Sequence, residues 1–251
     1  MPALALYVAA FRARCDARRG AAQPLLDAPG VTGLLGSAAR PLTRLLVTDD
    51  RARDTLPALL PGTGPAVVTV LAAAARCAEL LRGRPGWTAK PLTAMVCPDL
   101  RAVPAAPLPA GLTLRPVRRV AGDAPDGVPL EDAVGAALRA DPSIADPPDA
   151  FAAYLRSLPG VRLLAAVDGG GAVRATSGSG VAGTVANAFF VNTDPDWRGR
   201  GAGRAMTAAA LLAAREAGAR QGSLDATGAG FPIYRRLGFE TLTPTTQFVR
   251  A

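Results

Sequence analysis

The sequence predicts a mixed α/β (α+β) protein of two domains, and three observations support this class. At about 100–200 residues per domain, the 251 residues of the chain allow two domains. A proline-rich stretch at 98–111 divides the chain, because proline lacks the helical N–H donor and favours extended backbone. After this stretch, apolar patterns with strand and helix periods alternate. We therefore expect domains at 1–108 and 111–251.

The N-terminal half shows few patterns of regular structure. We expect helices at 3–19 and 65–84 and short strands at 42–47 and 92–97, whereas 20–41 is too rich in Gly, Pro and Ser for long elements. No catalytic constellation is visible in this half. We interpret it as a smaller helical or α/β accessory domain that serves packing or the formation of a homodimer.

The C-terminal half predicts a longer series of elements. Alternation favours a strand at 112–117, Pro and acids in a first turn favour a helix at 129–140, and alanine favours a long helix at 203–220. The other expected elements are a helix at 149–158, a strand at 161–168, two strands within 173–193 separated by a Gly/Ser turn, a strand at 223–226, a helix at 231–238 and a strand near 245–250. Pro232 fits the first turn of that last helix and Gly238 its C-cap.

Composition excludes several kinds of catalytic site. The chain contains no histidine, which excludes Ser-His-Asp triads, Cys-His dyads and imidazole ligands for a metal. Its cysteines, Cys15, Cys77 and Cys97, form neither a C-x-x-C pair nor an even set, so we expect buried, reduced thiols. We accordingly expect no metal cofactor.

Composition also restricts partners and location. No apolar run approaches the roughly 18–20 residues of a membrane span, and no charged segment precedes the apolar residues 3–11 as in a secretory signal. The net charge is +8, but no Lys/Arg run exceeds two residues and few aromatic residues are interleaved with the basic ones. We expect a cytoplasmic globular protein that binds neither nucleic acid nor membranes.

The most informative segment follows the second strand expected within 173–193. Three glycines at alternate positions, Gly199, Gly201 and Gly203, join this apolar strand to the long helix at 203–220. Free N–H groups at a helix start carry partial positive charge, and glycine lets an anion approach them. The pattern predicts a phosphate or diphosphate site, reinforced by flanking arginines.

Two other phosphate-binding motifs do not fit this segment. A dinucleotide fingerprint needs G-x-G-x-x-G, but counting from Gly199 or Gly201 puts Arg204 or Met206 at the third glycine. Asp225, which ends a strand further on, imitates the ribose-binding acid of that fold. A nucleotide P-loop is excluded because no G-K-[ST] is present.

Two motifs in order resemble the GNAT superfamily of acyl-CoA-dependent N-acyltransferases. Residues 198–203, Arg-Gly-Arg-Gly-Ala-Gly, fit its diphosphate loop [QR]-x-x-G-x-[GA], and residues 234–239, Tyr-Arg-Arg-Leu-Gly-Phe, resemble its Y-x-x-[LF]-G-F signature. The resemblance covers about 112–251. It implies a central mixed sheet, flanked by helices, in which two parallel strands splay into a V that holds acetyl-CoA or another acyl-CoA.

The resemblance also assigns roles to particular residues. Backbone groups near Val191 and Thr193 would bond the pantetheine amides, an N–H near Phe190 or Val191 would polarise the thioester carbonyl, and Tyr234 would protonate the departing thiolate. A neutral primary amine of a small molecule would attack the thioester. The full set of expected cofactor-binding residues is Phe190, Val191, Thr193, Arg198, Gly199, Arg200, Gly201, Ala202, Gly203, Arg204 and Thr227.

Three questions stay open at this point. Many family members carry a carboxylate on the strand before the loop, but 181–193 contains none. Proton removal could pass through water to Asp194, Asp225 or an acid of the earlier helices, or the amine could arrive neutral. A non-catalytic CoA-binding module is the rival function. Residues 1–110 could be a degenerate copy of the same fold, although no second R-x-x-G-x-G occurs there.

Acidic residues cluster between 121 and 160, where few basic residues accompany them. Such a wall would suit a cationic amine, and acids at helix starts also serve as ordinary caps. The acceptor amine is therefore expected on the side of the helices at 129–140 and 149–158.

Overall fold

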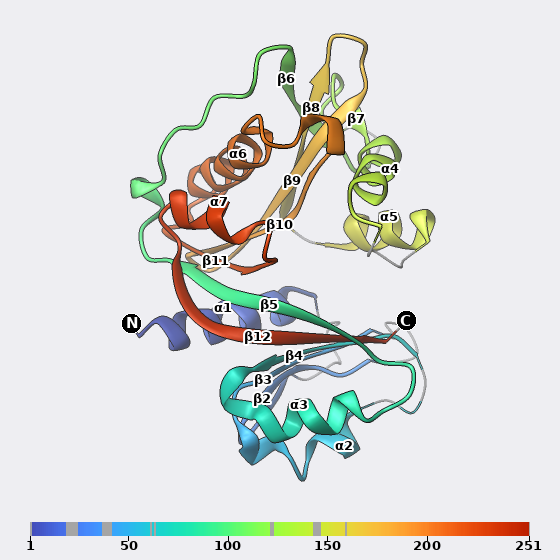
Figure 1. The fold of residues 1–251 in the computed structure, drawn as a ribbon, viewed down its shortest axis with the longest axis vertical. Coiled ribbons are helices and arrows are strands. Elements are labelled where there is room, and N and C mark those ends of the chain that lie inside the picture. Colours follow the sequence, from blue (N-terminus) through green and yellow to red (C-terminus); the bar gives the residue numbers. More distant parts are fainter. Residues whose placement is uncertain are drawn as a thin grey trace. The chain divides into compact units, whose positions relative to one another are not determined.

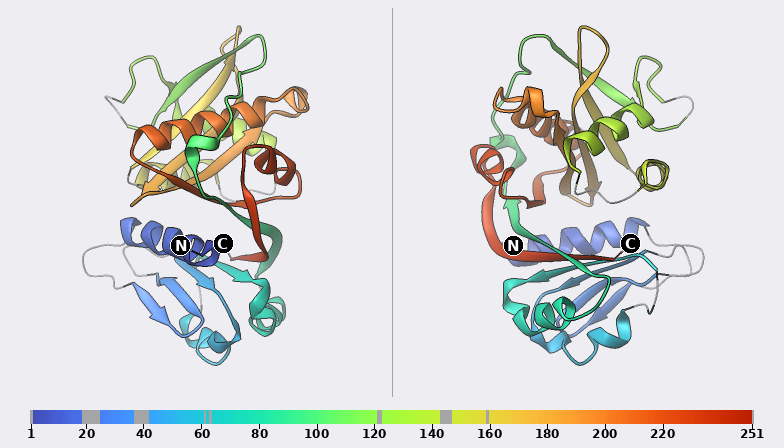
Figure 2. Two further views of the ribbon diagram at one scale, coloured as in Figure 1. Left: turned by 90° about the vertical axis from the view of Figure 1, so that its left-hand side faces the viewer. Right: turned by 45° about the vertical axis from the view of Figure 1, so that its right-hand side comes forward.

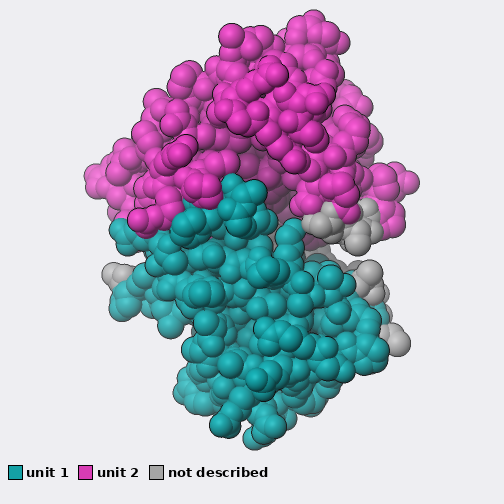
Figure 3. Space-filling model, in the orientation of Figure 1, with its two compact units in different colours: residues 1–96, 225–231, 240–251 teal, residues 97–224, 232–239 magenta. Residues whose placement is uncertain are grey.

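The computed structural model describes residues 2–18, 25–36, 42–60, 62, 64–120, 123–142, 147–158 and 160–250. The chain divides into two compact units, coloured separately in Figure 3. Unit 1 contains residues 1–96, 225–231 and 240–251, and unit 2 contains residues 97–224 and 232–239.

Unit 1 is an α/β unit with helices on both faces of its sheet (Figures 1 and 2). Its helices are α1 (Ala3–Arg18), α2 (Leu56–Leu59) and α3 (Ala75–Arg82), with 3-10 turns at Asp50–Ala52 and Ala72–Ala74. Its strands are β1 (Leu26–Ala28), β2 (Val31–Leu34), β3 (Thr43–Val47), β4 (Ala66–Leu71), β5 (Thr88–Cys97) and β12 (Glu240–Arg250), in the order β1-β2-β3-β4-β12-β5. The β3–β4 pair is parallel, and the other pairs are antiparallel.

One sequence-based expectation for this half was wrong. The helix expected at 65–84 begins only at Ala75, because Ala66–Leu71 forms strand β4. This segment contains Val67, Val68, Thr69 and Val70, whose branched side chains favour extended backbone. The segment is enclosed by β3 on one side and β12 on the other, so tertiary pairing decides its conformation. The expected helix at 3–19 and the strands at 42–47 and 92–97 are confirmed.

The core of unit 1 joins residues from distant parts of the chain. Leu45 of β3, Val68 of β4 and Phe248 of β12 are completely buried in one cluster. Helices α2 and α3 close this cluster with Leu56 and Leu81. The side chain of Phe248 therefore belongs to a core that is otherwise built by N-terminal residues.

Unit 2 has a six-stranded order, β11-β10-β9-β8-β6-β7. The strands are β6 (Leu112–Arg118), β7 (Val128–Pro129), β8 (Val161–Asp168), β9 (Val173–Ala182), β10 (Val185–Thr193) and β11 (Gln221–Ala226). The helices are α4 (Leu130–Ala140), α5 (Pro148–Ser157), α6 (Ala202–Glu216) and α7 (Phe231–Arg236), with 3-10 turns at Leu100–Ala102 and Pro195–Trp197. The order of elements expected after residue 111 is confirmed, with the short strand β7 in addition.

Two apolar layers cover this sheet. Helix α6 lies on one face with Met206 in a cluster that includes Ala166 and Ala175, while α4 and α5 lie on the other face with Leu130 and Leu155 in the larger cluster (Figures 1 and 2). The predicted mixed α/β class is confirmed, and most strand pairs are antiparallel. The exceptions in this unit are β10–β11 and β6–β7.

Two details differ from the expectations. The turn between β9 and β10 lies at Gly183–Thr184, whereas residues 177–180, Ser-Gly-Ser-Gly, belong to β9. Gly178 is needed inside the strand, because a Cβ there would lie 2.6 Å from Leu163 Cδ2. The expected domain boundary at 108–111 also differs from the division into two units. Strand β12 belongs to the expected second domain, but it pairs with β4 and β5 and so lies in unit 1.

Candidate functional site: an open strand pair and a glycine-lined helix start

Strands β10 and β11 begin as a parallel pair and then part. Their pairing runs only from Val185 with Gln221 to Asn187 with Ser223, although β10 continues to Thr193. At the last paired position the Asn187 side-chain amide donates a hydrogen bond to the Ser223 carbonyl at 2.9 Å. Asn187 therefore ties the two strands together where the opening begins, and the predicted V lies beyond it.

A β-bulge in β10 accompanies the opening. The register with β9 shifts between Phe189, opposite Gly178, and Asn192, opposite Thr176. Phe190 adopts φ +57°, which is rare for a residue other than glycine, and its carbonyl accepts a hydrogen bond from Thr176 Oγ1 at 2.9 Å. A bulge leaves its extra residue out of the strand ladder. Backbone groups at Phe190 and Val191, two expected site residues, thus lie at the irregular part of the strand.

Packing accounts for the unusual backbone at Phe190. Its ring is 9% exposed and meets the Phe151 ring edge-on, with ring centroids 5.7 Å apart. Burial of an aromatic ring stabilises the structure by a few kcal/mol, which offsets a backbone strain of about 1–3 kcal/mol. The side chain of Phe190 therefore belongs to the core, and only its backbone groups can contact a ligand.

The loop after β10 leads into an uncapped helix start. Gly201 is the N-cap of α6 with φ +92°, no side chain caps the helix, and no acid lies in its first turn. The first helical bond runs from the Ala205 N–H to the Gly201 carbonyl, so the N–H groups of Ala202, Gly203 and Arg204 have no helical partner. These amides and the helix dipole favour an anion.

The glycines of this loop differ in what they contribute. A Cβ at Gly199 or Gly201 would meet no atom within 4 Å, so the space beside these residues is open. Both have positive φ, which a side chain would strain. A Cβ at Gly203 would lie 3.3 Å from Thr193 Oγ1 and 3.5 Å from Ile233 Cδ1, which shows that α6 packs closely there. Gly203 thus serves packing, and Gly199 and Gly201 serve the turn.

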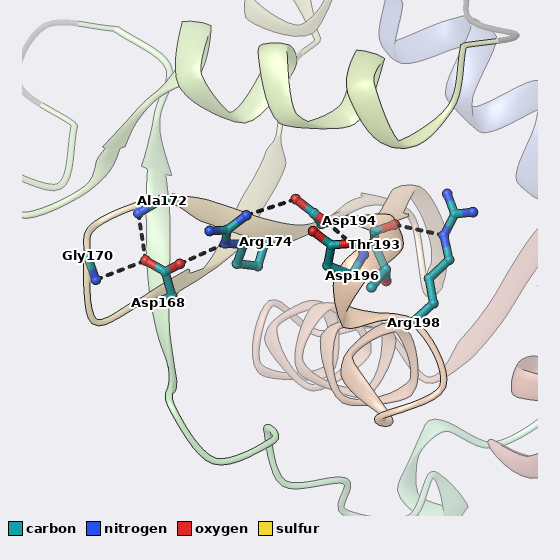
Figure 4. Close-up of polar contacts among 8 residues, drawn as sticks. All are labelled: Asp168, Gly170, Ala172, Arg174, Thr193, Asp194, Asp196 and Arg198. Atoms are coloured by element: carbon teal, nitrogen blue, oxygen red, sulfur yellow. Dashed lines mark hydrogen bonds and ion pairs between the residues drawn. The ribbon is translucent and has the colours of Figure 1, made fainter.

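A chain of charged side chains fixes the loop at the end of β10 (Figure 4). Arg174 of β9 donates from Nε to Asp168 Oδ2 at 2.7 Å and from a terminal nitrogen to Asp194 Oδ2 at 3.1 Å. Asp194 in turn accepts the Asp196 N–H at 3.0 Å and caps the 3-10 turn Pro195–Trp197. Asp194 is therefore part of the scaffold, which argues against its role as a general base.

The three arginines of the loop differ in their contacts. Arg198 donates from Nε to the Thr193 carbonyl at 3.1 Å (Figure 4) and from a terminal nitrogen to the Ala140 carbonyl at 2.6 Å. Its guanidinium thus links the loop to the end of α4. Arg200 lies over the Trp197 ring at 5.2 Å, and the Arg204 side chain is exposed at the start of α6. Arg200 and Arg204 are the cations left for an anionic ligand.

Tyr234 lies on α7 with its ring half-buried against Phe239, at 6.1 Å between centroids. Burial raises the pKa of Tyr234 from its usual 10.0 to about 12. Among the described residues, none forms a hydrogen bond with its hydroxyl. The phenol is therefore protonated at neutral pH and has a donor to offer.

In unit 1, Asp225 and Thr227 lie at and just after the end of β11. The Tyr7 hydroxyl of α1 donates to Asp225 Oδ1 at 2.6 Å. Burial raises the pKa of Asp225, and the Tyr7 bond opposes this rise. Thr227 is exposed, and its hydroxyl accepts the Gly230 N–H at 3.2 Å, which shapes the turn before α7.

The expected acidic wall at 121–160 is partly used by internal contacts. Glu131 forms an ion pair with Arg156, and Asp123 accepts the Arg119 N–H at 3.3 Å. Asp132 and Asp149 lie in the first turns of α4 and α5, where they complement the helix dipoles. Asp146 lies outside the described residues.

Other kinds of site find little support in the part of the chain that the structure describes. There, no group of three or more Cys, Asp or Glu residues has the arrangement of a metal site. The three cysteines form no disulfide and are buried, as expected. No described helix has both the length and the apolar character needed to cross a bilayer.

The family comparison agrees with the geometry. Residues 159–241, from β8 to the first residues of β12, match the family model of the acetyltransferase (GNAT) domain. Over these residues the chain is similar to a GNAT domain. Both motifs and the open strand pair lie inside the matched range.

A relative of known name matches only part of the chain. The mycothiol acetyltransferase of Saccharomonospora viridis is 38% identical over 69 residues, which are 26% of this chain and 22% of that protein. The chain thus matches less than a quarter of the length of this curated relative. The match is a likeness over a short stretch and assigns no substrate.

Solved structures resemble almost the whole chain in fold. A GCN5-related N-acetyltransferase from Kribbella flavida has a TM-score of 0.63 at 21% identity, covering 99% of this chain and 95% of that chain. A tandem GNAT protein from the clavulanic acid biosynthesis pathway has a TM-score of 0.52 at 17% identity, covering 97% and 93%. At such identities the likeness concerns the fold of the GNAT domain and of the residues before it.

Sequence reasoning missed Arg174, Asp168 and Asn187 as parts of this site. Asp168 precedes three glycines, a local signal for the β8–β9 turn. No local signal indicated that Arg174 would reach Asp194, because that contact depends on the pairing of β9 with the end of β10.

Proposed function

We propose that this chain is an N-acetyltransferase that moves an acetyl group from acetyl-CoA to a primary amine of a small molecule. The observation that carries this proposal is the uncapped, glycine-lined start of α6 beside the open end of the β10–β11 pair. An anion would meet free N–H donors there, and an extended arm would find the edge of β10 that is no longer paired with β11. A coenzyme that joins a diphosphate to a linear amide chain suits both features.

In the proposed reaction the neutral amine attacks the thioester carbonyl carbon. An N–H of Phe190 or Val191 at the bulge stabilises the oxyanion, and the C–S bond then breaks. The thiolate takes the Tyr234 phenolic proton. Burial that raises the pKa of Tyr234 also raises the proton affinity of a thiolate in the same surroundings, so the two groups stay comparable.

The acyl group is assigned as acetyl from the matched family description. For the acceptor we propose an amine that approaches from the side of α4 and α5, where Asp132, Asp149 and other acids are exposed. The general base is not assigned: it is Asp225 or another acid reached through water, or no base is needed because the amine arrives neutral. Buried cysteines without a disulfide are typical of a reducing compartment, which supports a cytoplasmic location. A homodimer stays a prediction.

Binding is tested by calorimetry with acetyl-CoA and Gly201→Asp, which inserts a side chain and a negative charge at the proposed diphosphate position. Gly218→Asp is a matched control, because Gly218 has φ +97° and equally open space but follows the other end of α6. We expect Gly201→Asp to abolish binding and Gly218→Asp to retain it. Unchanged binding by Gly201→Asp would contradict the site.

Catalysis is tested by release of free CoA thiol over a panel of small primary amines. Release that depends on one amine supports the transferase. Tight acetyl-CoA binding without release for any amine supports the rival function, a non-catalytic CoA-binding module.

A further inference from the structure

The charged chain behind the proposed diphosphate loop is fixed from its far end. Asp168 ends β8, and its carboxylate accepts the N–H groups of Gly170 at 3.0 Å and Ala172 at 2.9 Å as well as Arg174 Nε (Figure 4). The hydrogen bond from Arg174 is the main cause that lowers the pKa of Asp168, and the hairpin amides add to it. Asp168 is therefore a rigid, ionised anchor for Arg174.

Arg174 passes this order on to the loop. Its guanidinium, with 30% of the side chain exposed, spans the carboxylates of Asp168 and Asp194, which are 18% and 17% exposed. Its main-chain carbonyl accepts the Asp194 N–H at 2.8 Å. Asp194 is thus held through both its backbone and its side chain by the same residue of β9.

Asp194 determines the path of the chain toward the glycines. One carboxylate oxygen accepts the Asp196 N–H, and its carbonyl accepts the Trp197 N–H at 2.9 Å. These bonds form the 3-10 turn from which Arg198 and Gly199 emerge. A change of the Asp194 side chain would therefore alter the direction of the loop amides.

Charge makes the same contact important in a second way. Asp194 carries a largely buried carboxylate in the same loop whose later amides would receive a diphosphate, and two negative charges repel each other. Arg174 offsets this charge, because its second pair is with Asp194. Without Arg174 the loop would present an uncompensated negative charge to an anionic ligand.

We propose that Arg174 is a positioning residue for the diphosphate of acetyl-CoA, acting through Asp194. This inference rests on the proposed function. Arg174 holds the loop in its binding geometry and neutralises Asp194, so its loss should weaken binding and leave the acyl-transfer step unchanged.

The test uses the full chain with Arg174→Met. We expect Kd and KM for acetyl-CoA to rise about tenfold while kcat stays within about twofold. Arg162→Met is the matched control, because Arg162 lies on neighbouring β8 with an exposed ion pair to Glu216 at 3.9 Å. It should leave both constants unchanged.

A double variant distinguishes a positioning role of Arg174 from a general loss of structure. Asn at position 194 still caps the turn but carries no charge, so Asp194→Asn should restore part of the affinity in the Arg174→Met protein. Further loss in the double variant, or a fall of kcat at unchanged KM, would overturn the inference.

The outcomes for the two proposals are distinct. Wild-type protein that binds no acetyl-CoA would refute the proposed function. Wild-type binding that Arg174→Met preserves, at an unchanged melting temperature, would refute only the role of Arg174. If Arg174→Met unfolds, Arg174→Gln supplies the test, because it removes the charge and keeps a hydrogen-bond donor. A wild-type Kd in that variant would also count against the inference.

Discussion

At the scale of single residues, Tyr234 carries the most specific chemical expectation. Its phenol has no hydrogen-bond partner among the described residues, and burial raises its pKa to about 12. An acid with a raised pKa stays protonated below that value and loses its proton only when the pH rises through it. Between pH 6 and pH 10 the phenol should therefore remain a donor.

Tyr234→Phe should lower kcat by about ten- to a thousandfold, as for other positioned acids, with little change in the Kd of acetyl-CoA. Because Tyr234 does not titrate in this range, the ratio of wild-type to variant kcat should be constant from pH 6 to pH 10. The measurement is kcat against pH for both proteins. A ratio that falls as the pH passes about 8–9 would show that the phenol ionises there, against this account.

At the scale of elements, the two halves of the chain contain a similar succession of strands and helices with one decisive difference. The later series of elements is β10, α6, β11, α7 and β12, and it has the same order of strands and helices as the earlier series β3, α2, β4, α3 and β5. In both series the first and third members are a parallel pair of strands. The β3–β4 pair, however, stays paired from Thr43 with Ala66 to Val47 with Val70. This succession supports the expectation of a second copy of the fold and shows that its strand pair is closed.

The loop after β3 shares one contact with the loop after β10 and has one more of its own. Asp49 accepts the Arg51 N–H at 3.0 Å, and Asp50 accepts the Cys77 N–H at 3.1 Å. The hydrogen bond from Arg51 is the main cause that lowers the pKa of Asp49 to about 2, so this carboxylate is ionised at neutral pH. Asp49 thus caps its 3-10 turn as Asp194 caps the turn after β10, and Asp50 in addition ties this loop to α3.

One chain should therefore bind one acetyl-CoA. Calorimetry at saturating protein concentration should give a stoichiometry of one for the wild type and no binding for Gly201→Asp. Asp49→Asn and Asp50→Asn should not create a second site, because the β3–β4 pair remains closed. A stoichiometry of two, or residual binding in Gly201→Asp, would assign a site to unit 1.

Elements with a strong local signal could be predicted from the sequence, and elements decided by distant pairing could not. The helix α6 and the loop Gly199–Gly203 follow from alanine content and glycine spacing. Strand β4 was mistaken for a helix, because its alanine-rich continuation into α3 hid a strand that β3 and β12 enclose. Arg174 and Asn187 escaped notice because their partners, Asp194 and Ser223, lie on other strands.

At the scale of the whole chain, the strand β12 completes a sheet whose other strands are all N-terminal. It lies between β4 and β5, pairing with β4 from Thr245 to Arg250 and with β5 from Glu240 to Val249. Arg250 reinforces this position, donating to the Gly64 carbonyl at 2.8 Å and lying over the Trp87 ring at 5.2 Å. Residues 1–96 thus lack a central strand of their own.

Removing β12 should therefore unfold unit 1. Truncation after Phe239 leaves β4 and β5 with unpaired edges and takes Phe248 out of the core, so residues 1–96 should lose protection against trypsin. Phe248→Ala is the milder test, and it should lower the free energy of unfolding by about 3–5 kcal/mol, as for other buried aromatic residues. The control Gln247→Ala changes a half-buried neighbour on the same strand and should have a much smaller effect.

Because β12 is made after every other strand of its sheet, a fragment of residues 1–110 should not unfold cooperatively in urea unless a peptide of residues 240–251 is added. Cooperative unfolding of that fragment alone would show that the N-terminal strands form a stable sheet without β12.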